Sequence, residues 1–335
     1  MAGSTRESAT ADDVISDPDG AAAQRVSGGS ALGPAGAPLG KAVTSVSPWA
    51  EAWRRFKRHR LAYWSLWVLG FMVLALLVGP LIYKVGINSI DFKARLASPT
   101  ASHVFGTDDL GRDLLARMLY GGRISLAVGI SAMLMAITVG VIIGAVAGMA
   151  RGWVDSLMMW VTDLFLSLPQ LPLLLLLIFL FREPLKQAFG LEAGIFILIV
   201  TVIGGFRWMP VARLVRAQFF SLREKEFVEA ARALGASTTR QVVRHILPNS
   251  LGPVIVAATI DVAAAIIAES TLSFLGLGFP PDIPTWGRIL YDSRDYMDLA
   301  VHWALFPGLA IFLTVLTINF IGDGLRDALD PRRVM

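Results

Sequence analysis

Hydrophobic residues gather in six long stretches that are separated by polar or glycine-rich segments along the 335-residue chain. Each stretch, as a helix, is long enough to cross the roughly 30 Å of hydrocarbon in a bilayer. This pattern predicts an all-α polytopic membrane protein with six transmembrane helices. The expected spans are Leu61–Tyr83, Ile124–Ala150, Leu157–Phe181, Ala193–Met209, Leu251–Leu275 and Trp303–Ile321.

Composition agrees with this pattern. Hydrophobic residues make up 55% of the sequence and charged residues 17%, and the mean hydropathy is +0.60. A soluble globular protein carries about 25% charged residues, so the apolar excess is expected to face lipid. The net charge is only +4 and no basic arm is interleaved with aromatics, so we expect no nucleic-acid partner. The lack of cysteine excludes disulfides and thiol chemistry.

Basic residues lie mainly on one side of the spans, which predicts that both termini are cytoplasmic. They precede the first span, follow the last, and are frequent between the fourth and fifth spans. The loop 84–122 is then expected outside, as a small ordered extracytoplasmic element. The basic residues of the long inner connection are Arg213, Arg216, Arg223, Lys225, Arg232, Arg240 and Arg244.

A short basic segment precedes the first span. Trp49, Trp53 and Phe56 recur at helical spacing among five Arg and Lys residues, which is typical of a helix lying at headgroup level. The alternative is a basic stop before the first span. The expected organisation is a disordered cytoplasmic tail at 1–47, this helix with the first span and outer loop at 48–122, the main helical domain at 123–323 with an inner connection at 210–249, and a cytoplasmic tail at 324–335.

Two features of the spans predict how they pack. The third span contains Pro169 and Pro172, which favour a kinked helix inside a bundle. In the second span, small residues recur every four positions and form a ridge that lets a neighbouring helix approach closely. The ridge comprises Ala132, Ala136, Gly140, Gly144 and Gly148.

The sequence contains none of the common catalytic patterns. The four histidines are dispersed, and there is no H-E-x-x-H, G-x-S-x-G or P-loop string, so we expect no enzyme activity, bound metal or bound nucleotide. Ionisable residues at membrane depth are candidates for function. Asp261 and Glu269 share one face of the fifth span and are expected to point into the bundle. With Asp163 they are candidates for lining a translocation path or carrying protons, whereas structural pairing or an interfacial position is the alternative for Asp163 and Arg207.

The inner connection predicts a helical hairpin. Residues 226–234 are strong helix formers, Gly235 is expected to end this helix, and Ser237 or Thr238 can cap a second helix through Val243 to Ile246. An exposed apolar stripe on the first helix would be a docking surface; the alternative is a hairpin folded back on the membrane. The stripe comprises Phe227, Ala230, Ala231 and Leu234.

This connection resembles a known signature. Glu229-Ala230-Ala231, Gly235 and Leu247-Pro248 match the E-A-A-x-x-x-G and L-P motifs of the permease subunits of ATP-binding-cassette (ABC) importers. His245 and Ile246 before that L-P pair resemble the peptide branch of the family. Further strings resemble the C-type permeases of peptide and nickel importers: FGTDDLGRD at 105–113, GGRISL at 121–126, DLFLSLP at 163–169, SFLGLGF at 273–279 and PTWG at 284–287.

The resemblance implies a type I ABC importer (MetI-like) permease fold in the inner membrane of a bacterial cell. It implies uptake of dipeptides or oligopeptides with a second permease subunit, two ABC ATPase subunits that carry ATP and Mg, and an extracytoplasmic substrate-binding protein. The helix before Gly235 would be the coupling helix. The alternative is a self-contained ion-coupled carrier or channel, which has no reason to keep such a loop. The implied ATPase-coupling residues are Glu226, Glu229, Ala230, Ala231, Leu234, Gly235, Leu247 and Pro248.

Overall fold

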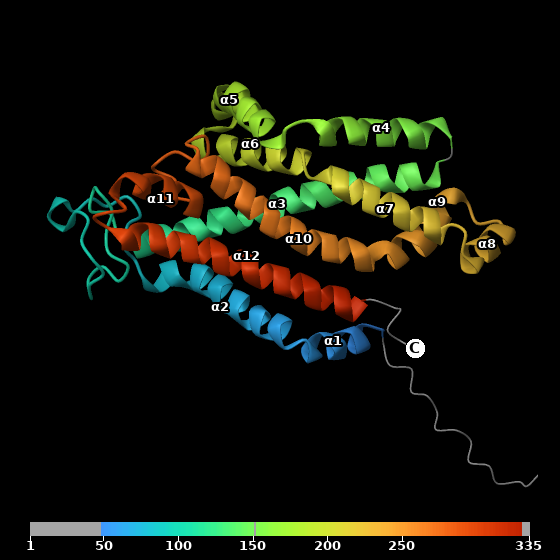
Figure 1. Cartoon of the computed structure of the whole chain (residues 1–335), viewed down its shortest axis with the longest axis horizontal. Helices are drawn as coiled ribbons and strands as arrows, with labels where there is room; N and C mark the ends of the chain where they lie inside the picture. The colour runs from blue at the N-terminus through green and yellow to red at the C-terminus, as the bar shows by residue number, and fades with distance from the viewer. Residues whose placement is uncertain (1–47, 151, 330–335) are drawn as a thin grey trace, which may run out of the picture. The chain divides into compact units, whose positions relative to one another are not determined.

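The computed structural model describes residues 48–150 and 152–329, so the expected tail at 1–47 lies outside the described residues. The described helices belong to one compact unit and form a bundle (Figure 1). The last helix runs to Leu329, so the tail expected from residue 324 begins as helix. The helices are α1 Pro48–Arg58, α2 Arg60–Ile82, η1 Phe92–Ala94, α3 Leu114–Met149, α4 Trp153–Ser167, α5 Gln170–Phe189, α6 Leu191–Gly205, α7 Trp208–Leu222, α8 Glu226–Ala233, α9 Thr238–Gln241, η2 Val242–Ile246, α10 Leu247–Phe274, α11 Trp286–Ser293, η3 Arg294–Tyr296 and α12 Val301–Leu329.

Among the described residues, four continuous helical segments are long and apolar enough to cross a membrane. They are α2, α3, α12 and the run Thr238–Phe274, which joins α9, η2 and α10. Two further spans are bent pairs: α4 with α5, at 87°, and α6 with α7, at 42°. The described chain therefore offers six spans when each bent pair counts as one.

The expected third span, Leu157–Phe181, is wrong as a single helix. The chain leaves helical geometry at Leu168, whose ψ is 138°, because the ring of Pro169 disfavours a helical residue before it. Pro172 lies in the first turn of α5, where proline is tolerated since its missing N–H would have no partner in the helix. The predicted kink thus belongs to Pro169 alone.

The expected fourth span, Ala193–Met209, is too short, and the connection predicted from residue 210 begins after Leu222. The helical segment continues through α7, which carries Arg213 and Arg216. Their guanidinium groups pair with the carboxylates of Asp163 and Asp155 on α4. These ion pairs offset the cost of placing two arginines on a membrane-spanning helix. Their charge alone predicts that both arginines lie in the inner connection.

The glycine ridge of α3 packs directly against α7, as its four-residue period predicts. A Cβ added to Gly144 would lie 2.5 Å from the carbonyl oxygen of Ala212, and one on Gly148 would lie 2.5 Å from Cβ of Phe219. Neither distance is sterically allowed, so the two helices approach this closely only because these positions lack side chains. We call the closely packed α3–α7 pair the spine.

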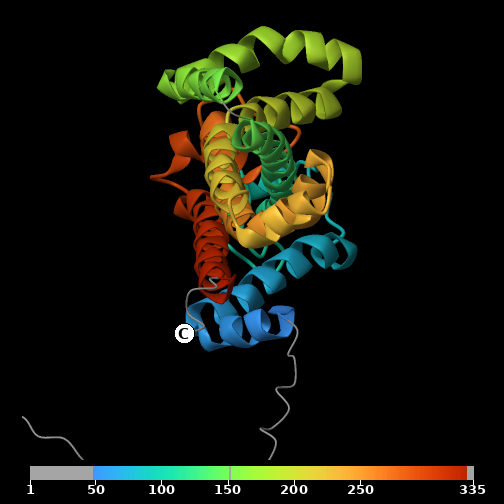
Figure 2. The same cartoon turned by 90° about the vertical axis from the view of Figure 1, so that its right-hand side faces the viewer.

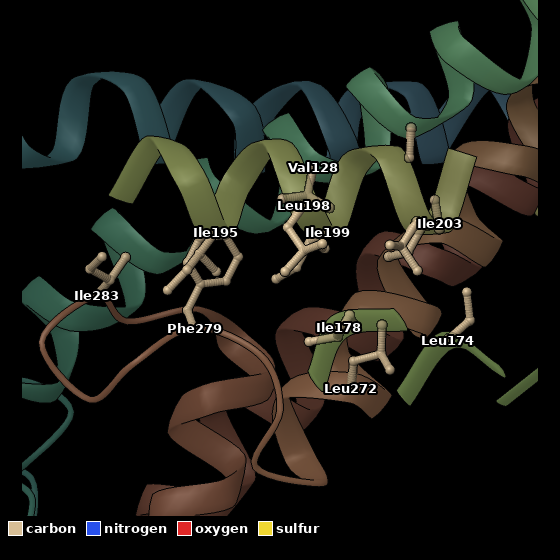
Figure 3. Packing of buried hydrophobic residues seen from close by; sticks show 13 residues of the cluster. Val128, Leu174, Ile178, Ile195, Leu198, Ile199, Ile203, Leu272, Phe279 and Ile283 are labelled. Carbon is tan, nitrogen blue, oxygen red and sulfur yellow. The ribbon is translucent and has the colours of Figure 1, made fainter. Parts of the chain in front are cut away.

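A buried apolar cluster joins α3, α5, α6, α10 and the loop that follows α10 (Figure 3). By contrast, α2 turns large side chains outward: Trp64 is 66% exposed, Phe71 71% and Ile82 79%. Such a face suits lipid contact. The labelled members of the cluster in Figure 3 are Val128, Leu174, Ile178, Ile195, Leu198, Ile199, Ile203, Leu272, Phe279 and Ile283.

The two ends of the bundle differ in content. The helices α1, α8 and α9 lie at one end, which we call the hairpin end, together with the end of α12 (Figure 1). The loop 83–113 and α11 lie at the opposite end, and we call them the cap. Figure 2, viewed from the hairpin end, shows α1 and α2 on the opposite side of the bundle from α4 and α5.

Candidate functional site

The first helix of the hairpin, α8, ends at Gly235 as the sequence predicts. Gly235 adopts a φ of +81°, which glycine reaches without the steric penalty of a Cβ. The N–H of Ala236 donates to the carbonyl of Ala231 at 3.0 Å, and the N–H of Gly235 donates to that of Arg232 at 2.9 Å. These two bonds form a Schellman motif, which fixes the direction in which the chain leaves α8.

The faces of α8 divide between the bundle and the surroundings. Val228 is fully buried and Ala231 is 8% exposed, so this side holds the helix to the bundle. The predicted stripe is therefore exposed except at Ala231, which lies on the buried side. Leu234 is 89% exposed and Phe227 42%. The exposed candidate residues of α8 and its end are Glu226, Phe227, Glu229, Ala230, Leu234 and Gly235.

The second part of the hairpin is continuous with a membrane span. The hydroxyl of Ser237 caps α9 by accepting from the N–H of Arg240, as predicted. The helix then passes through the π-turn η2 into α10, so the expected second helix reaches Ile246 but does not end there. The N–H of Leu247 reaches back five residues to the carbonyl of Val242, and Pro248 follows without an N–H of its own. No loop therefore separates the second part of the hairpin from the α10 span.

An apolar contact fixes α8 to the spine. Val228 and Ile246 pack in one buried cluster with Val211, Val215 and Phe219 of α7. Those three side chains also occupy the notches that the glycines of α3 leave open. The hairpin therefore rests on the α3–α7 spine through close contact.

Arg223 adds a polar tie at the same place, and reasoning from the sequence missed it. Its side chain is 6% exposed, lies over the ring of Phe220 and donates to the carbonyl oxygen of Gly148 at 2.8 Å. That carbonyl belongs to the last turn of α3, where a cation is favourable. The sequence showed Arg223 only as one basic residue among many; its spacing of four from Phe219 on the buried face of α7 was the available signal.

Asp261 and Arg207 form an ion pair at the joint of a bent span. Arg207 lies at the break between α6 and α7, and its Nη2 and Nε donate to Oδ1 of Asp261 at 2.6 and 3.0 Å. Asp261 is 5% exposed, which confirms that it points into the bundle. The pair connects α10 to the joint, in agreement with structural pairing of Arg207.

Glu269 is completely buried and joins three elements. Its carboxylate accepts from the hydroxyls of Ser125 on α3, at 3.2 Å, and Ser273 on α10, at 2.7 Å. The hydroxyl of Ser125 also accepts from the N–H of Trp286, the first residue of α11. The close approach of Gly287 to Ser270, where an added Cβ would lie 2.5 Å from Cα, holds α11 against α10. The strings at 121–126, 273–279 and 284–287 therefore meet at one buried cluster of hydrogen-bonded polar groups around Glu269.

Asp163 lies apart from the other two path candidates. It pairs with Arg213, and both side chains are about half exposed, at 57% and 50%. Asp261 and Glu269 are buried on α10. Asp261 and Glu269 thus lie on the buried face of one helix, whereas Asp163 lies on a different helix, α4.

The string at 105–113 builds the cap. Asp113 caps α3 by accepting from the N–H of Ala116, and it also accepts from the hydroxyl of Tyr83 at 2.7 Å and contacts Nδ1 of His103 at 2.9 Å. The carboxylate of Asp108 accepts hydrogen bonds from the backbone N–H of Arg112 at 2.8 Å and from its Nε at 2.6 Å. The expected ordered element is present, although it ends at Asp113 rather than at residue 122, where α3 has already begun.

Buried charges tie the start of α3 to α11 and to the loop that precedes it. Arg117 is 1% exposed, and its Nη2 donates to the carbonyl oxygen of Pro281 at 3.0 Å. The same nitrogen lies 3.8 Å from Oδ2 of Asp292 on α11, with which it forms an ion pair. Burial raises the pKa of the Asp292 carboxyl, and the nearby guanidinium groups of Arg288 and Arg117 oppose that rise. No group of three or more His, Asp or Glu side chains in the described part of the chain is arranged to hold a metal ion.

Comparison with family models gives two matches. The model described as binding-protein-dependent transport system inner membrane component matches residues 140–335. The model described as the N-terminal TM domain of oligopeptide transport permease C matches residues 47–99. Together they cover both the hairpin and the segment that holds α1 and α2.

Several relatives are similar over most of their length. The dipeptide transport system permease protein of Alkalihalophilus pseudofirmus is 40% identical over 289 residues, which are 86% of this chain and 91% of the relative. The oligopeptide transport system permease protein of Haemophilus influenzae is 41% identical, over 85% and 89% of the two chains. The glutathione transport system permease protein of Pectobacterium atrosepticum is 37% identical, over 85% and 92%.

Among solved structures, a chain of the inward-facing MetNI methionine ABC transporter is similar in fold. It superimposes with a TM-score of 0.52 at 20% sequence identity, covering 65% of this chain and 96% of that chain. This likeness shows the MetI-like arrangement of helices that the sequence predicts.

Proposed function

Because the chain belongs to the family of binding-protein-dependent transport system inner membrane components, we propose that it forms half of the translocation path of an ABC importer for dipeptides or oligopeptides. The observation that carries the coupling part is the geometry of α8. This short helix is closed by Gly235, held by Val228 on one side, and exposed along Phe227, Ala230 and Leu234 on the other. An exposed apolar face on a firmly held helix suits a groove in a partner protein.

The proposed partner at α8 is an ABC ATPase subunit. Glu229 would supply a polar contact and Ala230 a close-packed one, while Leu234 would insert beyond the end of the helix. Ala231, on the buried side, would hold α8 to the bundle rather than to the ATPase. ATP and Mg would be bound by the ATPase chains, and closure of two such chains would move α8. The movement is productive only if the contact differs in free energy between the two states of the transporter.

The rest of the assembly follows from the same proposal. A second permease subunit would complete the path, with the hairpin end in the cytoplasm of a bacterial cell and the cap outside. The cap would receive an extracytoplasmic substrate-binding protein, which would determine which peptide is delivered. The names of the relatives, which include dipeptide, oligopeptide and glutathione transport, support peptides as the substrate class.

A self-contained ion-coupled carrier is the weaker candidate. Asp261 is already paired with Arg207, and Glu269 is enclosed by the hydroxyls of Ser125 and Ser273. Both carboxylates therefore have structural partners that account for their burial. Family membership and the exposed α8 favour the ATPase-driven subunit.

The experiment that tests the proposal changes α8 alone. Glu229→Lys reverses the exposed charge, and Gly235→Pro removes both the left-handed conformation and the N–H that closes the helix. We expect either change to reduce peptide uptake into vesicles containing all partner subunits by at least about tenfold, which is roughly 1.4 kcal/mol of coupling. Membrane insertion should be unaffected.

The matched control is Glu183→Lys, which reverses an exposed carboxylate on α5, far along the chain from the hairpin. It should leave uptake near the wild-type rate. Wild-type uptake by both α8 variants would show that this helix is not the coupling element.

A further inference from the structure

We propose that the cationic face of α1 is a binding site for anionic lipid headgroups. The face consists of Arg54, Lys57 and Arg58 on α1, with Arg60 at the start of α2, and all four residues are exposed. The proposal concerns the membrane around the protein, so it does not depend on which substrate the transporter carries.

The distribution of side chains around α1 makes the face one-sided. Successive residues of a helix are about 100° apart, so Arg54, Lys57 and Arg58 fall within one sector of about 100°. Phe56 lies outside that sector and is 3% exposed, whereas Trp53, 48% exposed, lies between the two. A cationic sector bordered by a tryptophan is the arrangement of helices that lie at the level of lipid headgroups.

Packing on α12 fixes the direction in which this face points. The ring of Phe56 lies so close to Gly324 that a Cβ there would be 2.9 Å from it, and Ala62 and Ala328 complete the same buried cluster. Trp53 stacks on Phe56 with ring centroids 5.7 Å apart. The three cations of α1 are therefore presented by a helix seated on the bundle, and Arg60 begins the adjoining helix α2.

The position of the face along the bundle selects lipid as its ligand. Directly after Arg60, α2 exposes Leu61, Trp64 and Trp67 to 56%, 66% and 62%. The apolar surface suited to hydrocarbon thus begins within one residue of the cationic face. Lys57 lies 5.1 Å above the ring of Trp53, which orients its ammonium group beside the aromatic border. A soluble anion would have no use for the adjoining apolar surface, whereas a phospholipid occupies both.

The helix α1 carries four basic residues and one acidic residue. Glu51 of α1 pairs with Arg55, which is why Arg55 is not counted in the site. The remaining cations match the phosphate of phosphatidylglycerol and related lipids, for which arginine offers a planar set of donors.

The test compares retained lipid between charge-matched variants of the full-length subunit. The site variant carries Arg54→Gln, Lys57→Gln and Arg58→Gln. The control carries Lys84→Gln, Lys93→Gln and Arg294→Gln, which remove three exposed cations at the cap and change the net charge equally. Native mass spectrometry of protein extracted from bilayers of equal parts phosphatidylglycerol and phosphatidylcholine measures which lipid stays bound.

We expect wild type and control to retain phosphatidylglycerol several-fold over phosphatidylcholine, and the site variant to lose that preference. A variant with Arg54→Lys and Arg58→Lys should keep it, which separates loss of charge from loss of folding.

Equal loss in the control, or no loss in the site variant, would overturn the proposal. Displacement of the lipid by millimolar inorganic phosphate would do so too, since it would assign the face to a soluble anion. Failure of the site variant to join its ATPase partners in detergent without anionic lipid would assign it to a protein.

Discussion

At the scale of single residues, Gly235 and Glu269 act over different ranges: Gly235 shapes a turn among its neighbours, whereas Glu269 connects α10 to α3. Gly235 ends α8 by adopting a left-handed conformation. This turn involves only residues that are close in the sequence, so the sequence was sufficient to predict it. The carboxylate of Glu269 accepts from Ser273, which lies four residues away on the same helix, and from Ser125, which lies 144 residues away on α3. The sequence could place Glu269 on an inward face. It could not show whether Glu269 takes part in transport or holds helices together through buried hydrogen bonds.

Substitution of Glu269 separates these two roles. Glu269→Gln keeps the volume and the capacity to bond Ser125 and Ser273, so we expect nearly wild-type thermal stability and uptake. Glu269→Ala leaves a cavity and two buried hydroxyls without their acceptor, and should destabilise the protein by about 3 kcal/mol. Thermal unfolding in detergent and uptake in vesicles measure the two effects. A stable Gln variant that transports nothing would instead establish that Glu269 carries a proton or lines the path.

At the scale of helices, the period of a sequence predicts the face that packs, whereas breaks depend on what the neighbours allow. The ridge of α3 was predictable since its spacing is regular, and its partner α7 could be identified only from the structure. The kink at Pro169 was located correctly, but its 87° angle was not predictable. The hairpin was placed correctly, but the start of the inner connection was misplaced because Arg213 and Arg216 suggest a polar loop until their partners on α4 are known.

The close contact of α3 and α7 gives a prediction at this scale. Gly144→Leu would drive a side chain into the backbone of Ala212 and Cβ of Val215, and we expect a loss of about 3 kcal/mol from overpacking. Gly308→Leu on α12 is the control, since no atom lies within 4 Å of a Cβ at that position. Thermal unfolding of the purified subunits should show a much lower midpoint only for the first variant. Similar midpoints would mean that the spine tolerates separation of its two helices.

At the scale of the whole molecule, the sequence predicted the all-helical membrane fold, the number of spans and the place of the hairpin. What it did not predict is the set of contacts that connects the hairpin to the rest. The exposed face of α8, its buried anchor at Val228 and the continuity of α9 with α10 place the hairpin at the meeting point of α3, α7 and α10. In the proposed importer, a force applied there would reach both the spine and the helix that carries Glu269 and Asp261.

Arg223 allows this transmission to be tested. It is the polar tie between the base of the hairpin and the last turn of α3, and it makes no part of the exposed face of α8. Arg223→Met retains the apolar stem over Phe220 but removes the donor to Gly148, at a cost of about 1–3 kcal/mol for the lost bond to a charged group. In the proposed importer, we expect ATP hydrolysis to continue while peptide uptake falls, so that less peptide enters per ATP hydrolysed.

The ratio of uptake to hydrolysis is the informative readout, because simple unfolding would lower both rates together. Arg223→Lys keeps the charge and should restore part of the ratio if the ammonium group reaches the same carbonyl. Arg240→Met, on the exposed surface of α9, removes a neighbouring cation without breaking a tie to α3 and should leave the ratio unchanged. An unchanged ratio in Arg223→Met would show that the apolar contact of Val228 and Ile246 with α7 is sufficient to couple the hairpin to the spans.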